Sequence, residues 1–350
     1  MTVPSPLSIF SFDTLQIRWG VPRGLLTAVI LLGVLDFGLS RADWPYRKYP
    51  SSYVGTFLAQ EEVLRSDPVP PRIIILGNSR SKGGLLSREM EHLLGLPKDT
   101  VLNLSIESGD LYDNCILQQR NRQRMKSARL LICCVDAYQW NANFPLSERF
   151  NHFASLTDRL NLDPSVPSLF GWFFRTEEKA ALYHAIFRRI QARVVSTLRP
   201  IAEKEPRGAP GNQPTAPPAL GPVEDPVAYW YGHFKLSPER LSLLQKIVHA
   251  AQEDGQQVLV VQLPVRDEWL REVRRTHSAD YDEYKATIHS LDGVSVALFD
   301  DASSCGLLAA DFQDWEHLNP TGAARFTQLW CDWLTNHERD TLTAIGASAR

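Results

Sequence analysis

The stretch that decides the fold reads Ile-Ile-Ile-Leu-Gly-Asn-Ser-Arg-Ser and occupies residues 73–81. A continuous aliphatic run stopped by a glycine is typical of a buried strand of a parallel sheet. In an open α/β sheet, ligands bind at the loops just past the carboxyl ends of the strands. Ser79 therefore stands where it can meet a substrate, although these residues alone also fit a serine that simply caps the next helix.

Four further apolar runs follow along the chain, each ending in polar residues or a proline. They are residues 101–105, 130–135, 258–264 and 294–300. Helical patterns separate these runs; for example, Ser237 and Pro238 form a strong helix start. Strands that alternate with helices in this way predict an α/β fold with a doubly wound parallel sheet of about five strands.

The composition excludes some classes of function. The chain has 350 residues, 44% of them hydrophobic and 22% charged, with a formal net charge of −3. This balance is that of an ordinary globular protein, and we expect no nucleic-acid partner. The five cysteines show no zinc-ligand spacing, so no metal is expected. A dinucleotide site is disfavoured, because no Gly-x-x-Gly follows Gly77.

A short N-terminal segment, residues 1–23, precedes a strongly apolar stretch over residues 24–40. Its 17 residues are at the short limit for crossing a bilayer, and Asp36 is unfavourable there. We expect a transmembrane signal anchor that holds the rest of the chain outside the cytoplasm, in the periplasm or the extracellular space. A cleaved signal peptide and a buried core helix are the alternatives. Basic residues on both sides leave the orientation undecided by charge.

The remaining chain divides by composition. Residues 41–70 are expected to be a linker, with a short helix between residues 50 and 70, and residues 71–335 the main domain. A helical, aromatic-rich insertion over 144–199 and a proline-rich loop over 200–228 interrupt this domain. Residues 336–350 are predicted to be a C-terminal tail.

Two residues suited to acid–base chemistry occur near the end of the chain. Asp314 and His317 stand three residues apart just before a predicted final helix. Asn319 and Pro320 are suited to begin that helix. A carboxylate at this spacing can orient the imidazole, and a histidine so held can take a proton from a serine hydroxyl. Alone, the motif also fits a helix-start carboxylate beside a surface histidine.

The order of these motifs resembles the SGNH (GDSL-like) hydrolase family. Gly-Asn-Ser follows the first strand, Asn-x-Ser-x-x-x-Gly the second, and Asp-x-x-His precedes the last helix. The resemblance covers about residues 70–335 and implies a flavodoxin-like three-layer α/β/α fold. It implies that Ser79 is the nucleophile, His317 the base and Asp314 the residue that orients the base.

The resemblance also implies an oxyanion hole with three donors. These are the backbone N–H of Ser79, a backbone N–H after the second strand, which Gly109 matches, and an asparagine side chain after the third strand. The nearest asparagines there are Asn141 and Asn143, and the choice between them stays open. Ser105 and Ser108 are the neighbouring alternatives to Gly109.

The third block departs from the family. Where the family usually shows Gly-x-Asn-Asp, this chain has Val-Asp-Ala-Tyr over residues 135–138. The departure disfavours an ordinary secreted lipase. The Gly-Asn-Ser-Arg turn and the Asp-x-x-His-Leu-Asn segment look similar to membrane-anchored SGNH-like proteins of bacterial envelopes, including those of polysaccharide O-acylation. Arg80 and Asn319 are therefore second-tier site candidates, although Arg80 could equally pair with a carboxylate and Asn319 could be only a cap.

The resemblance implies a serine esterase or acyltransferase that acts on O-acyl esters, O-acetyl above all, of an envelope or extracellular carbohydrate. The expected partners are an acylated carbohydrate or another small ester, together with the membrane. No metal and no organic cofactor are implied. Hydrolysis and acyl transfer stay open, since they share the first half-reaction. The alternative is a non-catalytic envelope scaffold or glycan-binding protein with a degenerate SGNH fold.

Overall fold

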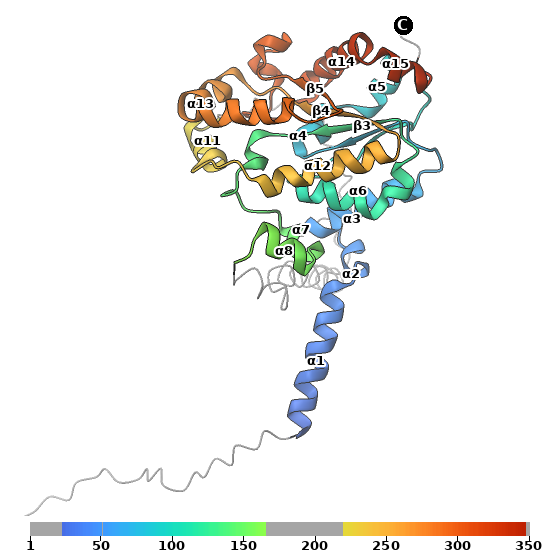
Figure 1. The fold of residues 1–350 in the computed structure, drawn as a ribbon, viewed down its shortest axis with the longest axis vertical. Helices are drawn as coiled ribbons and strands as arrows, with labels where there is room; N and C mark the ends of the chain where they lie inside the picture. The colour runs from blue at the N-terminus through green and yellow to red at the C-terminus, as the bar shows by residue number, and fades with distance from the viewer. Residues whose placement is uncertain (1–22, 51, 166–219, 348–350) are drawn as a thin grey trace, which may run out of the picture. The chain divides into compact units, whose positions relative to one another are not determined.

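The computed structural model describes residues 23–50, 52–165 and 220–347. The chain forms two compact units, Met1–Ala42 and Asp43–Arg350. In the first unit the described element is helix α1 (Arg23–Arg41). Seven of its large apolar side chains are exposed, from 41% for Phe37 to 66% for Val34. The second unit holds the sheet and its helices (Figure 1).

The N-terminal apolar stretch is helical, but the prediction of a transmembrane segment over residues 24–40 is not supported. Across the described parts of the chain, no helix combines the length and the apolar character needed to cross a membrane. Within α1, Asp36 and three glycines interrupt the apolar residues.

Five parallel strands form one sheet, as predicted, in the order β2-β1-β3-β4-β5. The strands are β1 (Ile73–Leu76), β2 (Val101–Asn103), β3 (Leu130–Cys134), β4 (Gln257–Gln262) and β5 (Ser295–Leu298). After β1 the chain crosses to β2 on one side and then returns to β3 on the other. The carboxyl ends of β1 and β3 therefore form the switch point at which ligands bind in such sheets.

The sheet is covered on both faces, which explains why its central strands read as unbroken apolar runs. Side chains alternate between the faces, so Ile74 and Leu76 of β1 enter one core while Ile73 and Ile75 enter the other. All four are at most 1% exposed. The continuous apolar pattern follows directly from this two-sided burial.

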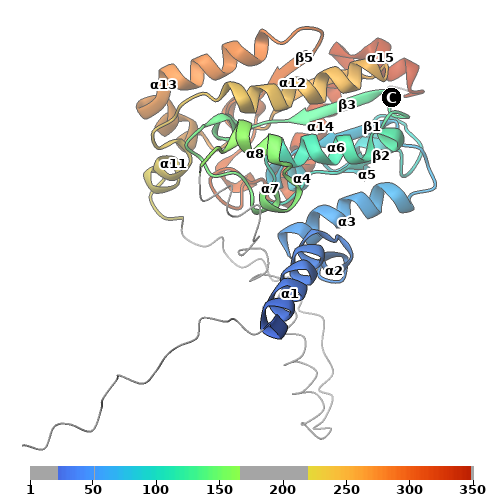
Figure 2. The same cartoon turned by 60° about the horizontal axis from the view of Figure 1, so that its bottom comes forward.

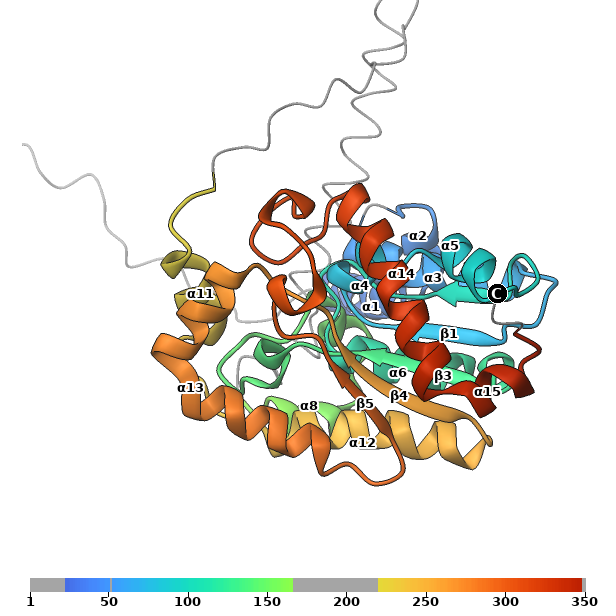
Figure 3. The ribbon, with the colours of Figure 1, turned by 90° about the horizontal axis from the view of Figure 1, so that it is seen from above.

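Helices form the outer two layers, as the views from two further directions show (Figures 2 and 3). One face packs against α3 (Tyr53–Ser66), α6 (Leu111–Met125), α12 (Pro238–Glu253) and α13 (Asp267–His289). The opposite face packs against α5 (Ser87–Leu93), α14 (Pro320–His337) and α15 (Arg339–Ala344). The short helix α4 (Ser79–Gly84) connects β1 to α5 and lies against α14. The predicted three-layer α/β/α arrangement is confirmed.

Two predicted boundaries of the main domain are wrong. The expected linker over residues 41–70 contains α2 (Trp44–Arg47) and α3, and α3 buries Phe57 and Leu58 in the first core. The expected tail over 336–350 contains α15, which buries Leu342 in the second core. Both segments carry apolar side chains on one helical face, and packing against the sheet decides their structure.

The predicted insertion is described only in part. It begins with α7 (Glu148–Phe153) and α8 (Leu156–Leu162), while the expected helix up to residue 199 and most of the proline-rich loop lie outside the described residues. That loop was predicted to run to residue 228, but α11 (Glu224–Tyr231) begins earlier. Two acidic residues in its first turn favour a helix start.

A methyl group at Gly77 is expected to destabilise the domain, because this glycine is packed closely against buried side chains at the start of the turn that carries Ser79. A Cβ atom there would lie 2.1 Å from Ser81 Oγ and 2.8 Å from Cys134 Cβ. Ser81 is fully buried and donates to Ser105 Oγ over 2.8 Å, so it has no free direction in which to move. Gly77→Ala should therefore cost about 1–3 kcal/mol of unfolding free energy.

Urea unfolding measures that cost, with Gly83→Ala as the matched control, since no atom lies within 4 Å of a Cβ at Gly83. Equal stability of the two variants would contradict the packing described for Gly77.

Candidate active site

In the turn after β1, Ser79 is not the N-cap of the following helix. Asn78 is the N-cap of α4, and its side-chain oxygen accepts the backbone N–H of Arg80 over 3.0 Å. Ser79 is the first helical residue, and its side chain is partly exposed. The capping interpretation of this serine is therefore wrong, and its hydroxyl is left for another partner.

The loop before α14 is shaped by Asp314. One carboxylate oxygen, Oδ1, accepts the backbone N–H groups of Glu316 and His317 over 2.9 and 2.7 Å. Asn319 caps α14, because its Oδ1 accepts the N–H groups of Thr321 and Gly322 at 3.0 Å. These bonds hold the imidazole of His317 between a tight loop and a fixed helix start.

The structure brings Ser79, His317 and Asp314 into one hydrogen-bonded chain, although 235 residues separate the first from the third in sequence (314 − 79). Ser79 Oγ lies 2.8 Å from His317 Nε2. His317 Nδ1 lies 2.8 Å from Oδ2 and 3.1 Å from Oδ1 of Asp314. These distances lie within the range for a nucleophile, its base and the residue that orients the base.

The local electrostatics suit a base. Burial alone would lower the pKa of His317, but the hydrogen bond that its Nδ1–H donates to Asp314 and the nearby carboxylate charges outweigh burial and raise that pKa above 6.5. Burial alone would raise the pKa of Asp314, but its bonds to His317 and to the backbone N–H of Glu316 lower it. Asp314 is thus ionised at neutral pH and stabilises the imidazolium.

No protein-family model matches the chain, and no curated protein matches its sequence. Among solved structures, one described as "a putative platelet activating factor from Streptococcus pneumonia" is similar at 10% sequence identity. The match covers 89% of this chain and 99% of that chain, with a TM-score of 0.38.

Gly109, which the resemblance implies as an oxyanion-hole residue, lies beside the turn that carries the serine. A Cβ atom on Gly109 would lie 3.3 Å from the carbonyl oxygen of Gly77. Its own N–H, however, donates to the carbonyl of Ile106 over 2.9 Å. In this conformation the Gly109 N–H is engaged in a tight turn.

The asparagines after β3 do not reach Ser79. The Nδ2 group of Asn141 donates to the carbonyls of Trp230 and Gly232 at 3.3 and 3.4 Å, and that of Asn143 donates to the carbonyl of His233 at 2.6 Å. Neither amide is available to an oxyanion at Ser79 in this conformation. The short 3-10 helix over Ala137–Trp140 directs the chain away from the serine before either asparagine is reached.

Asp136 occupies the place after β3 where the expected asparagine is missing, and it is 4% exposed. Its Oδ1 is paired with Arg80 Nη1, and its Oδ2 accepts the side-chain amide of Asn78. Asn78 also donates to the hydroxyl of Tyr138 over 3.0 Å. The predicted second-tier residue Arg80 therefore forms a buried ion pair beneath the serine.

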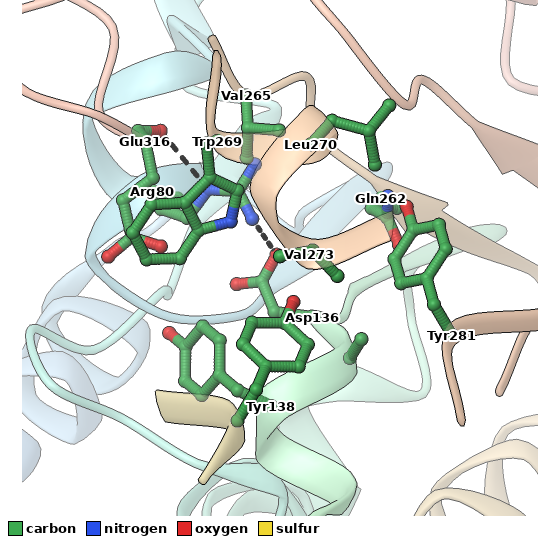
Figure 4. A pocket seen from close by; sticks show the side chains of 12 residues that line it. Arg80, Asp136, Tyr138, Gln262, Val265, Trp269, Leu270, Val273, Tyr281 and Glu316 are labelled. Carbon is green, nitrogen blue, oxygen red and sulfur yellow. Dashed lines mark hydrogen bonds and ion pairs between the residues drawn. The ribbon is translucent and has the colours of Figure 1, made fainter. Parts of the chain in front are cut away.

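The side chains of this pair help to line a small cavity of about 10 Å³, at the lower limit for one water molecule (Figure 4). Glu316 contributes to its wall. That residue keeps a partly exposed surface, but its Oε2 is enclosed and has no hydrogen-bond partner among the described residues. Burial raises the pKa of its carboxyl group to about 7.

Sequence reasoning did not assign roles to Asn78, Asp136 and Glu316. Asn78 and Asp136 each follow a strand, and β1 pairs with β3, so strand order alone could have placed them together. No group of three or more His, Cys, Asp or Glu side chains suited to a metal occurs in the described part of the chain. The absence of a cofactor stays a prediction.

Proposed function

We propose that this protein is an SGNH-type serine esterase or acyltransferase that acts on O-acyl esters, O-acetyl above all, of an envelope or extracellular carbohydrate. The observation that carries the proposal is the hydrogen-bonded chain from Ser79 Oγ through His317 to Asp314, at 2.8 Å for each of its two links. It stands at the switch point of a parallel sheet, where the fold favours a ligand.

In the proposed reaction, Ser79 Oγ attacks the carbonyl carbon of the ester while His317 Nε2 takes the serine proton. Asp314 holds the Nδ1–H and stabilises the imidazolium. The tetrahedral intermediate collapses as the C–O bond to the sugar breaks, and His317 returns the proton to the departing sugar oxygen. The acyl group remains on Ser79. Water or a second sugar hydroxyl, deprotonated by His317, then takes it and regenerates the serine.

One donor for the developing oxyanion is in place. The backbone N–H of Ser79 donates to no acceptor among the described residues, and it adjoins the attacking oxygen. The N–H of Gly109 would be freed by a small change in the turn over residues 106–109. Catalytic hydrogen bonds often form fully only with substrate bound. Each such donor contributes about 3–4 kcal/mol to the transition state.

An aromatic cluster beside the site supports a carbohydrate as the substrate. Trp230 packs against Tyr138 and Phe144 with ring centroids 4.5 and 4.7 Å apart, and the adjoining Tyr229 is 65% exposed. Tyr138 links the cluster to Asn78, the neighbour of Ser79. Aromatic side chains with one apolar face and one polar edge suit a ligand that has both characters.

A non-catalytic glycan-binding protein is the second candidate. The engaged N–H of Gly109 and the engaged amides of Asn141 and Asn143 favour it, because they leave the oxyanion site with one free donor. Both candidates bind an acetylated oligosaccharide, but only the enzyme releases acetate from it. Acetate release by the wild-type chain, lost in Ser79→Ala with binding retained, supports the enzyme. Binding without release in the wild type supports the second candidate.

The pH dependence of the reaction follows from the state of His317. Only the neutral imidazole accepts a proton, so kcat/KM for an aryl acetate should rise with pH. Because the pKa of His317 is raised, the midpoint of this rise should lie above pH 6.5. Asp314→Asn removes the charge that raises it, so the midpoint should move to lower pH and kcat should fall about 10⁴-fold.

Steady-state rates at a series of pH values measure both effects. Asp332→Asn, an exposed change on α14, is the control and should leave the profile unchanged. An unshifted profile in Asp314→Asn would contradict the assigned role of Asp314.

A further inference from the structure

The ion pair between Arg80 and Asp136 connects the turn that carries Ser79 to the segment that follows β3. It is almost fully buried, with 4% of the Arg80 side chain and 6% of the Asp136 side chain exposed. Burial alone would lower the pKa of Arg80, but the charge of Asp136 outweighs it and raises that pKa above its ordinary value. The guanidinium therefore keeps its positive charge although it is buried.

The Asp136 carboxylate holds both neighbours of Ser79. One oxygen accepts the side chain of Asn78 and the other accepts Arg80. A residue whose two neighbours are bonded to the same rigid group has little freedom to move. Asp136, just after the end of β3, therefore fixes the position and orientation of the Ser79 backbone.

Arg80 also reaches the loop that carries the base. Its Nε donates to the backbone carbonyl of Glu316 over 3.2 Å, and Glu316 directly precedes His317 (Figure 4). Its Nη2 donates to the carbonyls of Leu263 and Pro264, just past β4. The planar guanidinium therefore spans three chain segments, which a lysine with one ammonium group cannot do with the same geometry.

We propose that Arg80 and Asp136 act together as a positioning pair that sets the distance between Ser79 Oγ and His317 Nε2, an inference that rests on the proposed function. Stability alone does not explain such a pair, since well-packed apolar residues can replace a buried ion pair with little loss. Apolar residues cannot replace the directed bonds of the Arg80 guanidinium, which tie the turn that carries Arg80 and Ser79 to Asp136 and to the loop of His317.

The test separates positioning from stability with a pair of substitutions. Arg80→Met leaves the Asp136 charge buried and alone, so its Tm should fall steeply. Adding Asp136→Leu removes that charge, so Tm should recover toward the wild type. In the double variant, kcat for an aryl acetate should stay about 100-fold low, with KM within about threefold of the wild type, because a misplacement of 1 Å can cost that factor.

Arg80→Lys is the second variant, since it keeps the charge and removes the planar fork. It should show the same loss of kcat, and its crystal structure should show a longer Ser79 Oγ to His317 Nε2 distance. The matched control is Arg120→Lys, which alters a pair with the fully buried Glu61 on α3 and makes no contact with Ser79 or His317. It should lower Tm and leave kcat unchanged.

Recovery of wild-type kcat in the double variant, or a normal kcat in Arg80→Lys, overturns the positioning inference while the esterase proposal stands. A wild-type chain without esterase activity overturns the proposed function instead. In that case, an unchanged distance between Ser79 Oγ and His317 Nε2 in the structure of Arg80→Lys overturns the positioning inference as well.

Discussion

Replacing Ser79 by alanine is expected to lower kcat for an aryl acetate by about 10⁵-fold and to abolish covalent labelling by a fluorophosphonate. The reason is the position of the Ser79 Oγ atom relative to His317. Ser79 Oγ is 2.8 Å from the only group placed to accept its proton, His317 Nε2, in the part of the chain that the structure describes. Without that oxygen, no bond to the acyl carbon forms. The substrate site remains, so KM should change little.

His317→Ala should show nearly the same loss, because the serine and its base act as one unit and their effects do not add. The double variant should be no slower than either single variant by more than a few-fold. Ser127→Ala, an exposed serine after α6, is the control for labelling. Equal labelling of wild type and Ser79→Ala would show that another group reacts.

The second large effect concerns stability. Phe326 of α14 is fully buried in the core on the second face of the sheet, where its ring meets Phe299 edge-on with centroids 5.2 Å apart. Phe326→Ala should lower the free energy of unfolding by about 3–5 kcal/mol, the sum of lost transfer energy and the cavity left behind. Urea unfolding monitored by circular dichroism measures it.

Gln328→Ala changes an exposed residue on the same helix and should shift the free energy of unfolding by less than about 0.5 kcal/mol. Because α14 starts directly after the His317 loop, Phe326→Ala should also lower activity at temperatures near its own Tm. A loss in Phe326→Ala no larger than that in Gln328→Ala would mean that α14 does not pack on the sheet as described.

The parallel sheet and its strands could be predicted because both faces of each central strand are buried. Two-sided burial demands unbroken apolar runs, and a glycine or polar residue must end each run where the chain leaves the core. The place of Ser79 after the first strand followed from the same logic, whereas its grouping with Asp314 and His317 rested on the resemblance to the SGNH family. Each stands at a carboxyl end of a strand or in the loop before the last helix, and those points converge in a parallel sheet.

The sequence could not predict which polar side chain after β3, in the segment over residues 135–138, lies next to the turn of Ser79. The reason is physical. Which polar side chain reaches the serine depends on the path of the loop after β3, and a tight 3-10 turn there points Asp136 inward while it carries Asn141 away. Loop paths depend on tertiary contacts that a local pattern does not encode. The packing of α3 on the sheet and the existence of α15 were not predicted, since their apolar residues become informative only once the sheet they cover is known.

Trapping the acyl-enzyme tests the central claim most directly. The wild-type chain is mixed with an aryl acetate, quenched in acid within the first turnover and digested for mass spectrometry. We predict that the peptide carrying Ser79 gains the mass of one acetyl group, that Asp314→Asn forms it more slowly and that Ser79→Ala never forms it. Rapid release of the aryl alcohol with no acetyl group on Ser79 at any time point would contradict the account.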